Sequence, residues 1–130
     1  MGVAVPPVVA VHGPDMARRL FVGLIHPERE MAGVAYLDGS GRLLGLRHVA
    51  GGRDWSAVPP RTVVTDALAF DARAAVVAHN HPSGCACPSE ADRAFTRVLA
   101  QALAAVEVRL HDALILTVEE TTSFRALGLL

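Results

Sequence analysis

The part of this chain that most constrains its fold is the stretch from residue 74 to residue 106. Residues 74–79 are apolar and predict a short buried strand, and the letters HPSGCACP over 81–88 predict a tight loop. Residues 89–106 predict a long helix, because their apolar positions recur with the i, i+3, i+4, i+7 spacing of one helix face: Phe95, Val98, Leu99, Ala102, Leu103 and Val106. A strand followed by an amphipathic helix predicts a sheet with helices packed on it.

The rest of the chain predicts further elements of the same two kinds. Met16, Leu20 and Leu24 recur every four residues, which predicts a helix near the start. We expect residues 1–13 to be a flexible lead-in and 14–130 to be one domain, since 130 residues fit a single domain. The fold class predicted is α/β (α+β), a mixed sheet flanked by helices. The other expected elements are strands at 30–37, 42–49 and 108–117, a helix at 60–70 and a last helical turn at 122–127.

The composition excludes several classes of protein. Hydrophobic residues make up 52% and charged residues 19% of the chain, which predicts a compact domain and not a disordered one. The 12 basic residues are all Arg, so chemistry based on a lysine is excluded. With 13 acidic residues the net charge is −1, and we therefore expect only weak binding of duplex DNA by this chain.

The expected compartment is the cytoplasm. Two cysteines, Cys85 and Cys87, cannot form a disulfide framework, and a reducing compartment is then the default. No apolar run approaches the ~18–20 residues that span a bilayer. The N-terminal segment lacks the basic start of a signal peptide and contains two prolines, so we expect no membrane association.

Three side chains around the loop at 81–88 can form a metal site. His79 and His81 are two residues apart at the end of a strand, so both side chains can point at one spot. Asp92 lies three residues before Phe95 on the core-facing stripe of the helix, where an isolated carboxylate is costly. Two imidazoles and one carboxylate are the ligand count that zinc hydrolases use, with the fourth position left to water.

Each of these features has an ordinary structural interpretation. Ser89-x-x-Asp92 also fits a helix capping box, and a His-x-His pair is often simple surface polarity. Neither interpretation explains why three ligand types converge on one loop, and we therefore favour the metal site. Cys85 and Cys87 lie at the far end of the loop, and we interpret them as loop residues and not as thiolate ligands.

The pattern His79-x-His81, seven residues, Ser89-x-x-Asp92 resembles the JAMM motif of the MPN (JAB-type, cytidine-deaminase-like) metallopeptidase fold. The wider string AHNHPSG…PSEAD resembles the RadC family within that fold. This resemblance implies a Zn²⁺ ion bound by His79, His81 and Asp92, and a hydrolase of amide or isopeptide bonds in a peptide or protein substrate. It also implies that Glu30, before the first apolar strand, is the catalytic acid/base and that Ser89 donates a hydrogen bond to the oxyanion.

Two departures from the family leave an alternative function open. The chain has no room for the helix-hairpin-helix region that RadC-type proteins usually carry, and Ala113 stands where the family tends to have a histidine after Leu-His-Asp. The alternative is a non-catalytic metal-binding scaffold or a DNA-repair-associated domain that binds a partner. If the protein is an enzyme, we expect its substrate specificity to lie in the loops around Gly51-Gly52 and Trp55.

Overall fold

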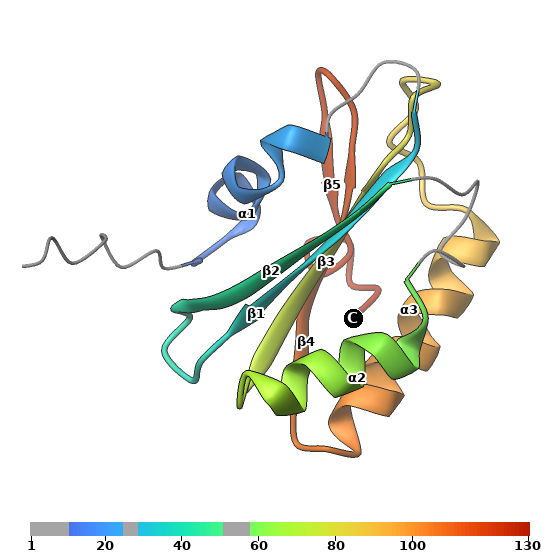
Figure 1. The fold of residues 1–130 in the computed structure, drawn as a ribbon. Coiled ribbons are helices and arrows are strands. Elements are labelled where there is room, and N and C mark those ends of the chain that lie inside the picture. Colours follow the sequence, from blue (N-terminus) through green and yellow to red (C-terminus); the bar gives the residue numbers. More distant parts are fainter. Residues whose placement is uncertain (1–10, 25–28, 51–57) are drawn as a thin grey trace, which may run out of the picture.

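A five-stranded mixed sheet with helices on both faces forms the domain (Figure 1). The computed structural model describes residues 11–24, 29–50 and 58–130. In the strand order β2-β1-β3-β4-β5, only β3 and β4 are parallel neighbours. The mixed α/β sheet expected from the sequence is therefore confirmed. The elements are α1 (Pro14–Leu20), the 3-10 helix η1 (Val22–Leu24), β1 (Met31–Leu37), β2 (Leu43–Ala50), α2 (Pro60–Ala69), β3 (Ala74–Asn80), α3 (Glu90–Ala104), β4 (Arg109–Leu116) and β5 (Thr121–Ser123).

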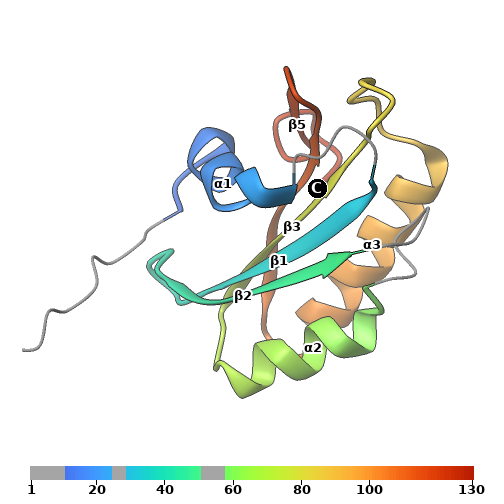
Figure 2. The same cartoon turned by 45° about the horizontal axis from the view of Figure 1, so that its top comes forward.

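The parallel pair β3 and β4 is connected by α3, because parallel strands need a long crossover. Helices α2 and α3 cover one face of the sheet, and α1 covers part of the other (Figure 2). The sheet therefore separates two apolar cores, one beneath α2 and α3 and one beneath α1. Alternate residues of β3 enter each core: Val77 faces α2 and α3, whereas Val76 faces α1. A central strand buried on both faces is continuously apolar, as residues 74–78 are.

For two helices the sequence predicts a side chain in the core that the structure places on the surface. Val98 is 54% exposed and Met16 is 41% exposed, although the sequence spacing predicts both on inner faces. In α3 the neighbour Leu99 is fully buried, and consecutive residues of a helix point about 100° apart. In α1 the buried residues are Ala17 and, just after the helix, Phe21, because the inner face lies one residue further along.

The last helical turn expected at 122–127 is present but begins later than predicted. Its first two residues belong to β5, which pairs with β4 through Leu114 opposite Ser123. The Ser123 hydroxyl donates to the Asp112 carboxylate at 2.5 Å and holds this short strand against its neighbour. A single turn follows, in which the Leu127 N–H donates to the Ser123 carbonyl at 3.1 Å.

The expected lead-in, residues 1–13, lies mostly outside the described residues. Val11 is 4% exposed, and its N–H donates to the Gly41 carbonyl at 2.8 Å, so Val11 is part of the core beneath α1. In the described part of the chain, no helix has both the length and the apolar character needed to cross a membrane.

A polar contact fixes α2 on the sheet. Asp66 of α2 accepts a hydrogen bond from the Tyr36 hydroxyl at 2.8 Å, and both of its oxygens accept from the Arg47 guanidinium. The hydrogen bond from Arg47 holds the pKa of Asp66 below its ordinary value. Gly45 leaves room for the end of the same helix, since a Cβ there would lie 2.4 Å from the Phe70 ring.

Candidate metal centre

The two histidines of the motif lie side by side at the end of β3. His79 belongs to the strand and His81 follows it, held in the extended line because its N–H donates to the Leu116 carbonyl at 2.9 Å. Their Nε2 atoms are 2.8 Å apart, and their ring centroids are 4.6 Å apart. Both imidazoles therefore point at one spot, as the two-residue spacing predicts.

Asp92 reaches the same spot from the first turn of α3. Its N–H donates to the Ser89 Oγ at 3.0 Å, while its Oδ2 accepts from the Ser89 N–H at 2.8 Å, which is a complete capping box. Asp92 is only 5% exposed, so the prediction that it faces inward is confirmed as well. The capping interpretation and the inward carboxylate are thus both correct.

The three side chains form one compact group of ligand atoms. The Oδ1 of Asp92 is 3.2 Å from the His79 Nε2, and its Oδ2 is 3.5 Å from the His81 Nε2. The candidate ligand atoms all lie within 4.8 Å of one another. A His-His-Asp group of this kind can hold a metal ion.

The spacing of this group fits a zinc ion. Ligand atoms at about 2.0–2.1 Å from a tetrahedral Zn²⁺ lie roughly 3.3 Å from one another. The two contacts of Asp92, at 3.2 and 3.5 Å, are close to this spacing, but they involve its two different oxygens, so binding through one oxygen requires a small shift of the carboxylate. The 2.8 Å between the two Nε2 atoms is shorter, so the rings need to separate by about half an ångström.

The charge states of His79 and Asp92 suit metal binding, whereas His81 has to lose a proton first. Burial lowers the pKa of His79 despite the neighbouring Asp92, which favours the neutral imidazole that a metal needs. The hydrogen bond with Asp92 raises the pKa of His81. Burial alone would raise the pKa of Asp92, but hydrogen bonds from His79, His81 and the Ser89 N–H hold it well below its ordinary range.

The loop between strand and helix sets the tautomer of His81. The His81 Nδ1 lies 2.9 Å from the Cys85 carbonyl, and because a carbonyl only accepts, Nδ1 carries the proton. Nε2 is then the ring nitrogen that faces Asp92 and His79, and it can bind an ion once it has lost the proton that it donates to Asp92. Backbone carbonyls commonly orient metal-binding histidines in this way.

Cys85 and Cys87 form a local disulfide in this loop, a bond that the sequence did not predict. Their Cα atoms are 5.3 Å apart, within the usual range for a disulfide. The bond spans one intervening residue and cross-links no separate elements, so it is not a framework. Bonded to each other, the two sulfurs are not thiolate ligands, which agrees with their interpretation as loop residues.

Glu30 immediately precedes β1 and is half-buried. In β1 Ala32 pairs with His79 and faces the core beneath α2 and α3, whereas Met31 faces α1. Continuing this alternation by one residue places Glu30 on the face that carries both histidines. Burial and Asp92 have the largest effects on the pKa values of His79 and His81. The negative charge of Glu30 has a smaller effect and favours a higher pKa of both imidazoles.

Ser89 has a hydroxyl proton that the helix cap does not use. Its Oγ accepts from the Asp92 N–H, and among the described residues no acceptor takes the proton of that hydroxyl. The hydroxyl lies at the same helix start as Asp92. The position of Ser89 is therefore compatible with donation to a substrate oxygen beside the ligand group.

The remaining residues singled out from the sequence fall in two places. Ala113 is 1% exposed in the core and pairs with Val77, so a methyl group fills the place of the family's histidine. The loop residues Gly51, Gly52 and Trp55 lie outside the described residues.

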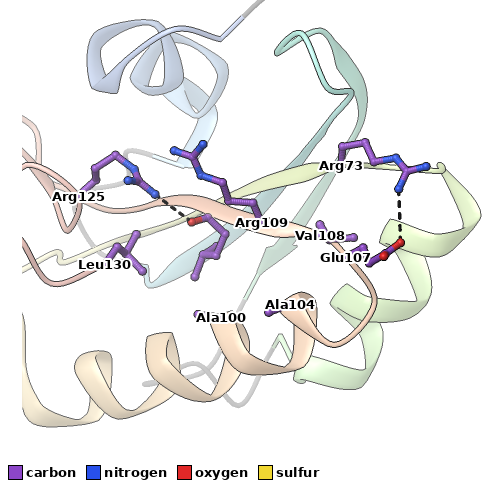
Figure 3. A pocket seen from close by; sticks show the side chains of 9 residues that line it. Arg73, Ala100, Ala104, Glu107, Val108, Arg109, Arg125 and Leu130 are labelled. Atoms are coloured by element: carbon purple, nitrogen blue, oxygen red, sulfur yellow. Dashed lines mark hydrogen bonds and ion pairs between the residues drawn. The ribbon is translucent and has the colours of Figure 1, made fainter.

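A separate hollow of about 440 Å³ lies at the other end of α3, beside the start of β4 (Figure 3). Arg73 at its rim pairs with Glu107 at 4.0 Å, and Arg125 donates to the Leu110 carbonyl at 3.4 Å. Small and aliphatic side chains, among them Ala100 and Ala104, line its floor. None of the motif residues lines this hollow, so it is separate from the His-His-Asp group.

Comparison with known proteins agrees with this geometry. Residues 11–129 match the family model described as a RadC-like JAB domain. The chain belongs to the RadC family. The JAB domain of this family points to a JAMM-type metal site, and the residues of that motif are those that converge here.

The alignments with individual relatives cover only part of each relative's length. The chain is 45% identical over 102 residues to a UPF0758 protein of Polaromonas sp. (strain JS666 / ATCC BAA-500), which covers 78% of this chain and 46% of that protein. It is 43% identical over 123 residues to a UPF0758 protein of Bordetella petrii, covering 93% and 55%, respectively. This RadC-family chain thus spans about half the length of these relatives.

Proposed function

We propose that this chain is a zinc-dependent hydrolase that cleaves amide or isopeptide bonds in a peptide or protein substrate. The observation that carries the proposal is the convergence of two imidazole nitrogens and a buried carboxylate within 4.8 Å. His79, His81 and Asp92 would hold the ion and leave its fourth position open, as in catalytic zinc sites. The bound ion would supply a Lewis acid that lowers the pKa of water to near 7.

The chain's own residues divide the remaining work. Glu30 accepts a proton from the attacking water while the water oxygen bonds to the substrate carbonyl carbon. As the C–N bond breaks, Glu30 returns that proton to the leaving amine nitrogen. The Ser89 hydroxyl donates a hydrogen bond to the carbonyl oxygen while negative charge develops on it. The position of Glu30 on the face of His79 and His81 supports this division.

The proposal is tested on the purified chain by measuring zinc and hydrolysis together. We expect about one zinc per chain and cleavage of some members of a library of peptides and isopeptide-linked protein fusions. A chelator should abolish this cleavage and added zinc should restore it. A chain that holds one zinc and cleaves no library member would contradict the proposal and favour a metal-binding scaffold.

A further inference from the structure

Asn80 stands between the two histidines but faces the other side of the sheet. In β3 the side chains alternate, with Val77 and His79 toward α2 and α3 and with Ala78 toward α1. Asn80 therefore lies on the α1 side, where it is 2% exposed. This orientation excludes Asn80 from the ligand group, and a buried amide there needs another explanation.

The Asn80 side chain binds the backbone on both sides of Glu30. Its Oδ1 accepts a hydrogen bond from the Met31 N–H at 2.6 Å. Its Nδ2 donates to the Arg29 carbonyl at 2.7 Å. One planar amide thus joins the peptide groups that precede and follow Glu30.

These two bonds replace the main-chain ladder where that ladder stops. The last paired residues of β1 and β3 are Ala32 and His79, so the Met31 N–H has no partner in the backbone of β3. A side chain that performs this task must offer an acceptor and a donor at once. Asn does so with a short stem, whereas an ionised Asp lacks the donor.

We infer that Asn80 is a positioning residue, which holds Glu30 over the His79–His81–Asp92 group by clamping the backbone on both sides of it. This inference rests on the proposed function, in which Glu30 transfers the proton. It assigns separate tasks to three consecutive residues: His79 and His81 bind the ion on one face, and Asn80 places the acid/base from the other. The electrostatic effect of Glu30 on both imidazoles supports the same placement.

The two hydrogen bonds of Asn80 can be tested without measuring hydrolysis. We expect hydrogen exchange at the Met31 amide, measured by NMR on the metal-free chain, to be at least about tenfold faster in Asn80→Ala, since that amide loses its acceptor. Ser123→Ala is the matched control, because it also removes a buried side-chain hydrogen bond but lies far from Glu30 in the sequence. Unchanged exchange at Met31 in Asn80→Ala would overturn the inference.

A second, milder variant keeps the inference testable if Asn80→Ala does not fold. Asn80→Asp keeps the acceptor for the Met31 N–H and removes only the donor to the Arg29 carbonyl. In this variant we expect the Met31 amide to stay protected while the turnover still falls. Turnover equal to that of the wild type would contradict the claim that the hydrogen bond to the Arg29 carbonyl is needed to position Glu30.

The positioning role is tested by a double-mutant cycle with Glu30. We expect Asn80→Ala to keep about one zinc per chain and an unchanged KM, while kcat falls by about 10²-fold, the cost of a misplaced catalytic group. In a Glu30→Gln background, Asn80→Ala should cause no further fall. An equal fall in both backgrounds would identify a merely structural role and overturn the inference. If the wild type binds zinc and cleaves nothing, the proposed function fails, and the exchange at Met31 still decides the clamp.

Discussion

Asp92 and Ser89 exchange two hydrogen bonds at the start of α3, and the same Asp92 carboxylate contacts both histidines at the end of β3. The cap of the helix is therefore part of the candidate metal-ligand group. The Ser89 N–H fixes the orientation of the carboxylate before any ion binds. This preorganisation lowers the entropy that metal binding would otherwise cost.

The double role of Asp92 predicts that its two tasks can be separated. Asp92→Asn keeps an oxygen that accepts from the Ser89 N–H but replaces the anionic carboxylate ligand with a neutral amide, which binds zinc more weakly. We expect at least about a tenfold loss of zinc affinity with little change in melting temperature. Asp92→Ala should lose the zinc and also about 1 kcal/mol of stability. Zinc titration and thermal unfolding measure the two effects.

Ser89→Ala is the complementary control for the Asp92 variants. It removes the acceptor of the Asp92 N–H and should cost about 1 kcal/mol of unfolding free energy. Because the Ser89 N–H remains, the carboxylate keeps its orientation and the zinc content should stay near one per chain. Full zinc retention in Asp92→Ala would contradict the ligand assignment.

The disulfide between Cys85 and Cys87 predicts a metal site that is independent of sulfur. Changing both residues to Ser leaves the Cys85 carbonyl in place, and this backbone atom is what orients His81. We expect the double variant to bind as much zinc as the wild type, measured by elemental analysis. Loss of the ion would show that the site contains thiolate ligands.

The contact between Asp66 and Arg47 predicts a stability difference that depends on pH. The folded state lowers the pKa of Asp66 below its ordinary value of about 3.9, so its contribution is present above pH 4 and is lost as the pH falls through the lower folded value. At pH 7 we expect Asp66→Asn to be less stable by about 1 kcal/mol, a modest value because Arg47 is 44% exposed.

Below pH 4 the gap between the wild type and Asp66→Asn should narrow, because the unfolded wild-type chain binds a proton at this carboxylate before the folded chain does. Urea unfolding of both proteins at pH 7 and at pH 3 measures this change. A gap that is equal at both values would mean that the charge of Asp66 contributes nothing to stability.

The candidate site was predictable because its geometry is local. Residues two apart on a strand share a face, and Asp92 lies on the buried stripe of α3 with Leu99, so the spacing alone brings His79, His81 and Asp92 together. The mixed sheet was predictable for the same reason, since the strands and helices have clear periodicity.

The features that the sequence did not predict depend on distant contacts. Asn80 binds Met31 and the Arg29 carbonyl across about fifty residues, which no local pattern reveals. A signal was nevertheless present: a polar residue at the end of an apolar strand, on the face away from the histidines, needs a buried partner. The short β5 was missed because its pairing with β4, and not its own sequence, makes it a strand.

The central claim is that Glu30 transfers a proton without binding the ion, and Glu30→Gln tests it most directly. Gln keeps the size and a hydrogen-bonding end but cannot accept a proton. Zinc content and hydrolysis are to be measured on one preparation of each protein, with melting temperature as a check of folding. We predict unchanged zinc and a fall in hydrolysis of about 10²–10⁴-fold. Loss of zinc, or hydrolysis equal to that of the wild type, would contradict the claim.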